Sequence, residues 1–319
     1  MTTTETKSRL IEEIQMWKEK RNAIILAHNY EIPEVQDIAD VLGDSLMLAR
    51  AAAETTADVI VFCGVHFMAE TAAVLNPEKT VLLPDLKAGC SLADSITADQ
   101  LREWKAEHPE AVVVAYVNTT AEVKALSDYC CTSSNAVDIV NSIPADQEIL
   151  FLPDMFLGSF VQKETGRDNM QIWMGECHVH AGIQPDQVDE VMAKHPEADL
   201  LVHPECGCST SSMYLMSEGV LPKEKTHILS TGNMLKHSKN ADASEFVIAT
   251  EVGIIHQMQK QNPDKRFIAA NDQAICPFMK MITLEKVLDA LKENKHVITV
   301  EKDIADQAKL SIERMISIG

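Results

Sequence analysis

Three stretches of the chain decide the fold: AIILAHNY at residues 23–30, VVVAYVN at 112–118 and LLVHPE at 200–205. Each stretch is a short apolar run that passes directly into polar residues. Short apolar runs rich in β-branched residues, with helical stretches between them, are typical of parallel strands that are buried on both faces. We therefore predict an α/β fold. Further runs of this kind predict strands at 59–62, 81–83, 149–152, 228–229 and 267–269.

The polar ends of these three stretches are evenly spaced along the chain. His28 precedes Tyr116 by 88 residues, and Tyr116 precedes His203 by 87. Such a recurrence indicates an internally repeated architecture. A small hydroxyl motif follows each strand end, and a cysteine follows each motif after 44 or 45 residues. The three pairs of hydroxyl residue and cysteine are Ser45 with Cys90, Ser133 with Cys177, and Thr231 with Cys276.

The repeat predicts three αβα units, similar to Rossmann domains, over residues 1–108, 109–196 and 197–319. The hydroxyl motif lies 17 residues after the strand end in the first two units and 28 residues after it in the third. We therefore expect the third unit to carry an insertion near 206–222. Three related units are expected to pack with pseudo-threefold symmetry. Because ligands of parallel α/β sheets bind beyond the carboxyl ends of the strands, the active site is predicted to lie on the symmetry axis.

Three of the eight cysteines, Cys90, Cys177 and Cys276, recur at equivalent positions of the repeat. Threefold geometry would bring their thiolates together on the axis. Three thiolates without a fourth favour an iron–sulfur cluster that leaves one iron open to act as a Lewis acid. Zinc is an alternative at this point, because the segments 177–180 and 206–208 also offer sulfur and imidazole ligands at short spacing.

The other five cysteines have no counterparts in the repeat. Free cysteine is among the most buried residue types, so we interpret Cys63, Cys130 and Cys131 as packing residues. Cys206 and Cys208 lie in the expected insertion. They either shape the lip of the site or form a redox-sensitive pair, and the sequence leaves both interpretations open.

The hydroxyl residues Ser45, Ser133 and Thr231 each precede a helical segment, and we interpret them as N-cap residues. Helix N-termini present free backbone N–H groups and the positive end of the helix dipole, so they bind carboxylate or phosphate. The chain has 28 basic and 48 acidic residues, for a net charge of −20. Helix termini are therefore the expected means by which this acidic chain holds an anionic substrate.

The polar residues at the strand ends supply groups for acid–base chemistry. Glu205 is the only carboxylate among them and is the natural candidate for a general base. Convergence of such groups with three thiolates would make an active site. The six residues are His28, Tyr30, Tyr116, Asn118, His203 and Glu205.

The overall composition excludes several classes of function. The chain is 46% hydrophobic and 24% charged, which is ordinary for a globular protein. Its net charge of −20 repels nucleic acid and anionic lipid, so we expect neither as a partner. No apolar run approaches the roughly 20 residues that span a bilayer, and the first residues lack the apolar core of a signal peptide. We therefore expect a cytoplasmic protein.

Taken in order, these motifs resemble those of the quinolinate synthases, the family that makes the pyridine ring for NAD biosynthesis. The resemblance runs nearly from end to end, and its order makes it specific although several of its motifs are weak alone. The matching segments are 28–40, 43–45, 83–91, 116–118, 132–133, 203–205, 230–232 and 276–280, together with Cys177.

The resemblance implies a 4Fe-4S cluster held by Cys90, Cys177 and Cys276, with its fourth iron open. It implies condensation of iminoaspartate with dihydroxyacetone phosphate to quinolinate, with loss of phosphate and two waters. An aspartate-oxidising enzyme would be the upstream partner, because the imine is short-lived. As a mechanistic hypothesis we expect catalytic roles for Tyr30, Tyr116, His203 and Glu205. Substrate contacts are implied for His28, Ser45, Tyr116, Val117, Asn118, Ser133, His203, Pro204, Glu205 and Thr231.

Two other functions remain consistent with the residues. A different cluster-dependent hydro-lyase would share the open iron and act on a hydroxy acid. A metal-binding or electron-transfer protein without catalysis would need the cysteines and would have no use for acid–base residues at the strand ends.

Overall fold

The computed structural model describes residues 3–319 and contains three four-stranded sheets, all parallel. The strand order is the same in each sheet: β2-β1-β3-β4, β6-β5-β7-β8 and β10-β9-β11-β12. The α/β class with three αβα units is therefore confirmed. The strands are β1 (Ala23–His28), β2 (Val41–Gly43), β3 (Val59–Cys63), β4 (Thr80–Leu82), β5 (Val112–Tyr116), β6 (Tyr129–Cys131), β7 (Ile149–Leu152), β8 (Met170–Ile172), β9 (Asp199–Val202), β10 (Thr226–Ile228), β11 (Glu245–Ala249) and β12 (Arg266–Ala269).

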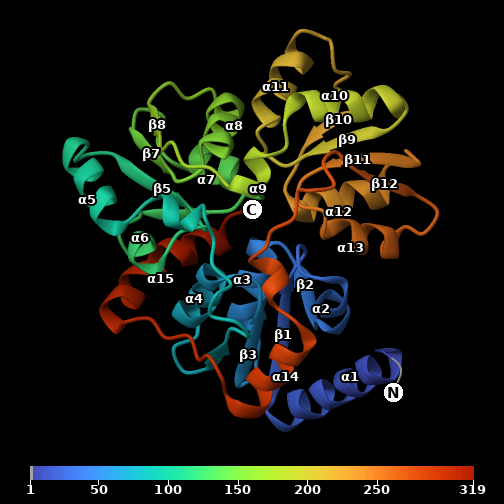
Figure 1. Cartoon of the computed structure of the whole chain (residues 1–319). Coiled ribbons are helices and arrows are strands. Elements are labelled where there is room, and N and C mark those ends of the chain that lie inside the picture. Colours follow the sequence, from blue (N-terminus) through green and yellow to red (C-terminus); the bar gives the residue numbers. More distant parts are fainter. Residues whose placement is uncertain (1–2) are drawn as a thin grey trace.

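Helices connect the strands and cover the sheets, and the three sheets with their helices surround a common centre (Figure 1). Among the described residues, no helix is both long and apolar enough to cross a membrane. The helices are α1 (Thr3–Lys20), α2 (Pro33–Ile38), α3 (Ser45–Glu54), α4 (His66–Leu75), α5 (Ala98–Glu107), α6 (Ala121–Ala125), α7 (Ala136–Ser142), α8 (Met155–Thr165), α9 (His178–Ala181), α10 (Pro185–Lys194), α11 (Ser209–Ser217), α12 (Thr231–Asn240), α13 (Ile254–Gln261), α14 (Leu284–Glu293) and α15 (Lys302–Ser317), with short 3-10 helices η1 (Ala93–Ser95) and η2 (Met279–Met281).

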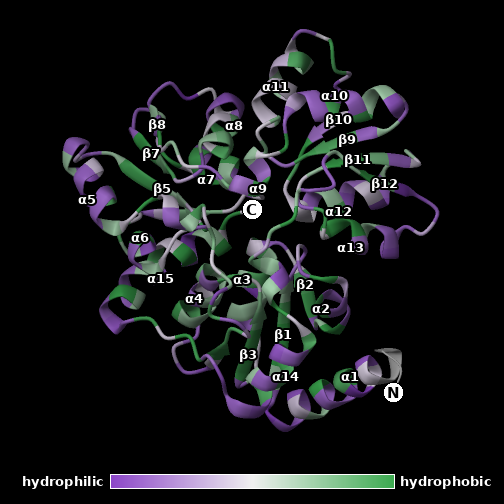
Figure 2. Ribbon diagram, viewed as in Figure 1, coloured by the Kyte–Doolittle hydropathy of each residue, from purple (hydrophilic) through white to green (hydrophobic). Residues whose placement is uncertain are grey.

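The strands form the core because they are mostly apolar. Every residue of β3 and of β7 is buried, as expected for strands that helices cover on both faces. Figure 2 shows the strands as hydrophobic and the outer faces of the helices as mostly hydrophilic. The helix α14 illustrates the pattern, since Leu284, Val287, Leu288 and Leu291 lie on its buried face.

All eight predicted strands are present, and four further strands were not predicted. Three of these, β2, β6 and β8, have three residues each and read VLG, YCC and MQI, so they lack the continuous aliphatic run on which the prediction relied. The fourth is β11, a buried strand in the middle of the third sheet. Its omission matters for the site, because the polar residue that follows it was missed as well.

The connection from β9 to β10 is longer than its counterparts. Twelve residues join β1 to β2 and β5 to β6, whereas twenty-three join β9 to β10 and include α11. The last two helices return to the other units: α14 packs on α1 and β3, and α15 packs on α6, β6, α4 and α3. The end of the described chain therefore ties the first two units together.

Candidate active site

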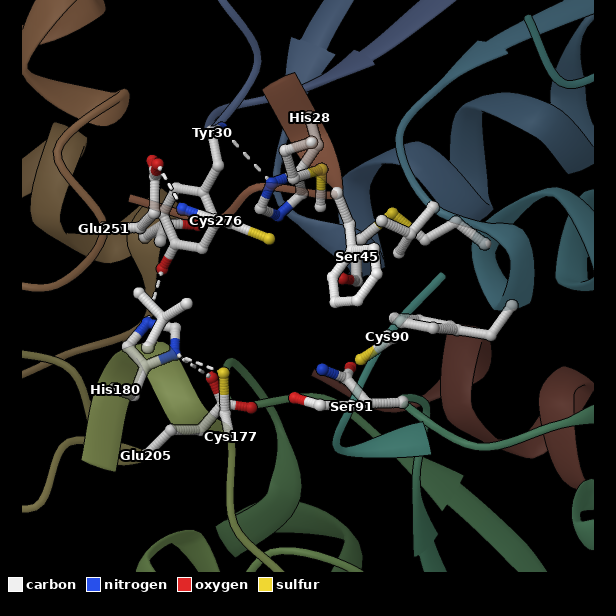
Figure 3. Close-up of a pocket in the computed structure, with 18 of the residues that line it drawn as sticks. His28, Tyr30, Ser45, Cys90, Ser91, Cys177, His180, Glu205, Glu251 and Cys276 are labelled. Carbon is white, nitrogen blue, oxygen red and sulfur yellow. Dashed lines mark hydrogen bonds and ion pairs between the residues drawn. The ribbon is translucent and has the colours of Figure 1, made fainter. Parts of the chain in front are cut away.

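A cavity lies where the three units meet, beyond the carboxyl ends of the strands (Figure 3). We call it the central cavity. His28 ends β1, Tyr116 ends β5 and His203 directly follows β9, so equivalent positions of the three sheets reach it. Its lining includes His28, Tyr30, Asp44, Ser45, Val65, Phe67, Met68, Cys90, Ser91, Tyr116, Asn118, Ser133, Cys177, His178, His180, His203, Glu205, Thr231, Glu251, Cys276, Phe278 and Met279.

The structure brings twelve residues singled out from the sequence into this cavity. The three repeated cysteines, the three hydroxyl residues and all six polar residues of the strand ends line it. Val117 and Pro204 are not among the lining residues, although both are buried next to residues that are. The repeat thus correctly identified which strand ends face one another.

Glu205 lies at the centre of a buried group of histidines. Its Oε2 is 3.3 Å from Nδ1 of His180 and 3.3 Å from Nδ1 of His203. The two imidazole rings stack with centroids 5.0 Å apart. Burial raises the pKa of Glu205 to about 7, opposed by a hydrogen bond from Tyr116. A carboxyl with this pKa can both accept and donate a proton near neutral pH.

The histidines around Glu205 are uncharged at neutral pH. Burial lowers the pKa of His180 to about 3, and burial followed by the charge of Lys280 lowers that of His28 to about 3. Burial also lowers the pKa of His203 well below its usual value. These side chains therefore act as neutral hydrogen-bonding groups, and their contacts with Glu205 are not charge pairs.

Backbone contacts orient two of the histidines in the same way. The N–H of Tyr30 donates to Nδ1 of His28 at 3.2 Å, and the N–H of Glu205 donates to Nδ1 of His203 at 3.4 Å. A nitrogen that accepts a hydrogen bond leaves the proton of a neutral imidazole on the other nitrogen. The Nε2 of His203 lies 3.2 Å from Oγ of Ser133 inside the cavity. Both rings therefore present an N–H donor.

Each repeated cysteine follows the last strand of its sheet and precedes a short helical turn. In every case the sulfur accepts hydrogen bonds from the backbone N–H groups two and three residues further on. The donors are Leu92 and Ala93 for Cys90, Val179 and His180 for Cys177, and Phe278 and Met279 for Cys276. Such donors stabilise thiolates, the form in which cysteine binds metal. Figure 3 shows all three sulfurs pointing into the cavity.

The three sulfurs lie too far apart in this structure for all of them to bind one zinc ion. Among the described residues, they belong to no group of donor atoms that all lie within 4.8 Å of one another. A tetrahedral zinc with Zn–S bonds of about 2.3 Å would hold its sulfurs closer together than this. Without a cation, burial raises the pKa of the Cys90 thiol to about 12, so the thiolates need a positively charged group to form.

The remaining cysteines do not face the cavity. Cys63, Cys130 and Cys131 are completely buried in the core, which confirms their interpretation as packing residues. Cys206 and Cys208 are also buried, in the cluster of apolar side chains beneath the third sheet. Sγ of Cys206 donates to the carbonyl of Ala249 at 2.8 Å. This pair therefore does not form the lip of the site.

The interpretation of Ser45, Ser133 and Thr231 as N-cap residues is wrong. The caps of α3 and α12 are Asp44 and Ser230, whose side chains accept from the backbone N–H groups of Met47 and Asn233. Ser45 and Thr231 occupy the first helical positions, and Asn135, which makes no side-chain cap, precedes α7. Because neighbouring residues perform the capping, the hydroxyl groups are left to line the cavity.

The residues directly beside Ser45, Ser133 and Thr231 in the sequence contact one another. Oγ of Ser134 lies 2.7 Å from Oδ2 of Asp44 and 2.8 Å from Oγ of Ser230. These contacts join one motif from each unit. They fix the starts of α3 and α12 relative to each other at the cavity wall.

Sequence reasoning missed several residues of the site. His180 lies three residues after Cys177, and its Nε2 is 2.9 Å from Oγ1 of Thr250, which in turn is 2.6 Å from the hydroxyl of Tyr30. Glu251 is completely buried and pairs with Nζ of Lys280 at 2.8 Å. The signal for Glu251 was its position two residues after a strand, but that strand, β11, was not predicted.

Comparisons with known proteins agree on one family. A family model described as "Quinolinate synthetase A protein" matches residues 12–317. The quinolinate synthase of Mycobacterium sp. (strain KMS) is 58% identical over 307 residues, which cover 96% of this chain and 91% of the relative. The quinolinate synthase of Mycobacterium tuberculosis (strain ATCC 25618 / H37Rv) is 56% identical over 307 residues, covering 96% of this chain and 88% of the relative.

Proposed function

Because the chain belongs to the quinolinate synthase family, whose enzymes serve NAD biosynthesis and need an iron–sulfur cluster, we propose that its central cavity condenses iminoaspartate with dihydroxyacetone phosphate. The products would be quinolinate, one phosphate and two waters, which balances the atoms of the two substrates. The main observation behind this proposal is that the three equivalent cysteines and Glu205 line the same cavity. The thiols fit a cofactor, and the carboxyl fits proton transfer.

We assign the cluster ligands to Cys90, Cys177 and Cys276, and the cluster to the 4Fe-4S type. Support comes from their equivalent positions in the three units and from the paired N–H donors on each sulfur. Three ligands leave one iron open, and when bound this iron supplies Lewis-acid chemistry to an oxygen of the substrate.

Glu205 is the residue that we assign to proton transfer. The condensation and the two dehydrations all move protons between carbon, nitrogen and oxygen atoms of the substrates. Burial places the pKa of Glu205 at about 7, close to the value that serves a general acid and a general base equally. Tyr30, Tyr116 and His203 surround it in the cavity and would donate hydrogen bonds to substrate oxygens.

Anion binding is assigned to the helix starts. Among the described residues that line the cavity, none is lysine or arginine. The carboxylates of iminoaspartate and the phosphate of its partner therefore need other donors. The ten-residue helices α3 and α12 begin at the cavity wall with Ser45 and Thr231, where free N–H groups and hydroxyls are available. Ser133, His28 and Asn118 would complete the substrate contacts.

The supply of iminoaspartate requires a second enzyme. Because the imine hydrolyses readily in water, we expect an aspartate-oxidising enzyme to release it nearby.

The eight cysteines are all free, which suits a reducing compartment such as the cytoplasm. The acid–base groups argue against an electron-transfer protein, and the family argues against a hydro-lyase acting on a hydroxy acid.

The reaction is tested by an anaerobic assay on iron-replete protein. Freshly generated iminoaspartate and dihydroxyacetone phosphate are supplied, quinolinate is measured by chromatography, and iron and sulfide are quantified on the same sample. We expect quinolinate and phosphate in equal amounts. A filled cluster without quinolinate would contradict the proposal.

The ligand assignment is tested by replacing cysteines one at a time. Cys90→Ser, Cys177→Ser and Cys276→Ser should each lose the visible absorbance of the cluster and most of the iron. Cys63→Ala serves as the control, because Cys63 is buried away from the cavity, and it should keep its iron. Loss of the cluster in a Cys206→Ala variant would overturn the assignment.

A further inference from the structure

Two histidines and an aspartate converge in the third unit, away from the central cavity. Asp199 is the first residue of β9, His227 lies in β10 and His237 lies in the last turn of α12. In parallel strands the carboxyl ends lie at one edge, so Asp199 is at the opposite end of β9 from His203. None of the three lines the central cavity. The proposed reaction therefore makes no use of them.

The sheet register places these side chains on one face. His227 pairs with Leu201, which lies two residues after Asp199 on the same strand, so Asp199 and His227 point to the same side of the sheet. Helix α12 brings His237 to this side, where its ring meets that of Phe246 edge-on at 6.3 Å. Phe246 is the register partner of Asp199 on β11.

The donor atoms lie close together. Nε2 of His237 is 3.1 Å from Oδ2 of Asp199, and Nε2 of His227 is 3.8 Å from the same oxygen. One donor atom from each of the three residues falls within 4.8 Å of the other two. Ligands about 2.0–2.1 Å from a tetrahedral zinc lie roughly 3.3 Å from one another, so the two measured distances bracket the value for a shared ion.

The arrangement leaves one nitrogen without a protein partner. Nε2 of His227 is buried and accepts or donates no hydrogen bond among the described residues, although it faces the carboxylate. This nitrogen is therefore free to bind a cation. The backbone carbonyl of Glu224 accepts a hydrogen bond from this imidazole, and because Nε2 has no partner, the donor is the other ring nitrogen. Metal-binding histidines usually have such a second partner.

We propose that Asp199, His227 and His237 form a binding site for a divalent zinc ion. Two imidazoles and one carboxylate are a ligand set that zinc uses in proteins, with water in the fourth position. The ring centroids of His227 and His237 are 4.0 Å apart, so one cation could be bound by both imidazoles. The net charge of −20 favours any cation.

A zinc ion here would clamp the third unit. It would join β9 to β10 and α12, which follow it in the sequence after the long connection through α11. The connection from β9 to β10 is eleven residues longer than its two counterparts. The ion would therefore hold β10 against β9, although the connection between these two strands is the longest of the three. The site has a structural role and leaves the chemistry of the central cavity unchanged.

The proposal is tested by metal analysis of iron-replete protein. The protein is incubated with Zn²⁺ under anaerobic conditions, passed through a desalting column, and analysed for zinc and iron by mass spectrometry. We expect about one zinc per chain. His227→Gln and His237→Gln, which retain size and hydrogen bonding, should lose this zinc and keep the iron. His256→Gln is the matched control, because His256 also contacts an aspartate, Asp37 at 3.0 Å, but forms no three-residue group of metal-binding side chains among the described residues.

Zinc X-ray absorption separates this site from the cysteines. Nitrogen and oxygen ligands at about 2.0 Å are expected here, whereas zinc bound by the cysteines would show sulfur at about 2.3 Å. Hydrogen exchange in β10 and α12 should slow on zinc addition in the wild type and in His256→Gln only. Equal zinc in the wild type and the His227→Gln variant, or scattering by sulfur, would overturn the proposal. Either result would leave the quinolinate assay unaffected, so the two proposals fail separately.

Discussion

Glu205 has a buried oxygen, Oε1, with no hydrogen-bond partner among the described residues, while its other oxygen faces two histidines. An unpaired carboxylate oxygen in a buried site favours the protonated form. A substrate N–H or O–H that entered the cavity would satisfy Oε1 and would lower the pKa of the carboxyl. Substrate binding would thereby convert Glu205 into its ionised form, which can act as a base.

Replacing Glu205 by glutamine removes this proton exchange and preserves the size of the side chain. We expect the turnover of Glu205→Gln to fall by about 10²–10⁴-fold, the usual contribution of a general acid–base group. Iron and sulfide per chain should not change, because Glu205 is not a proposed ligand. The measurement is the anaerobic quinolinate assay with metal analysis of the same samples.

A matched control makes this result specific. Glu218 follows α11 and is exposed, so Glu218→Gln makes the same chemical change outside the site and should leave turnover unaltered. Normal turnover of Glu205→Gln would remove Glu205 from proton transfer. Loss of iron from this variant would instead indicate that Glu205 positions the cluster.

At the scale of elements, the loops that carry the cysteines are held by buried carboxylates. Glu251, two residues after β11, accepts the N–H of Cys276 at 3.0 Å. Asp154, two residues after β7, accepts a hydrogen bond from the backbone of Cys177. The first unit has Val65 at the equivalent position after β3. Two of the three cysteine loops thus depend on an acceptor from the neighbouring strand, which fixes the direction of the sulfur.

Gly175 shows how tightly one of these loops packs. A Cβ at this position would lie 2.4 Å from the carbonyl oxygen of Pro153 and 2.4 Å from Oγ of Ser95. The backbone cannot move away easily, because Gly175 also exchanges hydrogen bonds with the backbone of Pro153 and Met155. We expect Gly175→Ala to displace the loop of Cys177 and to lose most of the iron, measured per chain after anaerobic purification.

Gly89 provides the comparison, since it directly precedes Cys90 and a Cβ there would meet no atom closer than 3.8 Å. Gly89→Ala should therefore keep its iron. If both glycine variants retained iron, the loop of Cys177 would be more adaptable than its contacts indicate. If both lost it, the residues next to the cysteines would matter for a reason other than packing.

These elements also show what could be predicted from the sequence. The repeat of strand end, hydroxyl motif and cysteine identified the three units and most of the cavity, because chain order fixes which strand ends face the axis. It did not identify Glu251, because the strand that precedes this residue, β11, was not recognised. It also assigned the caps to Ser45 and Thr231 in place of Asp44 and Ser230, since adjacent polar residues are equally good caps in sequence.

At the scale of the whole molecule, α15 joins the first and second units. It packs against α3 and α4 of the first unit and against α6 and β6 of the second. Arg50 on α3 donates to the carbonyls of Ile316 and Ile318, and Asn135 donates to those of Met315 and Ile318. The two units therefore share one helix whose inner face is buried, and we expect them to unfold together.

Ile312 tests this connection because it is completely buried on α15, whereas Leu310 on the same helix is 59% exposed. Ile312→Ala should lower the free energy of unfolding by about 2–5 kcal/mol through the lost contacts and the cavity left behind. Leu310→Ala should change it by less than about 0.5 kcal/mol. Denaturant titration followed by circular dichroism checks both values. Two separate transitions in the Ile312→Ala variant would show that the units unfold independently.

Removal of iron should leave this architecture intact. The three cysteines lie at the edge of the core, half-buried, whereas the strands beneath them bury apolar side chains that need no metal. We therefore expect protein treated with an iron chelator to keep its helical circular dichroism and to lose quinolinate formation. Its melting temperature should fall, because a group that binds only the native state stabilises that state. Anaerobic addition of iron and sulfide should restore activity. Loss of the helical signal on chelation would mean that the cluster is required for folding, as zinc is in zinc fingers, and that packing between the three units is weaker than the buried contacts of α15 indicate.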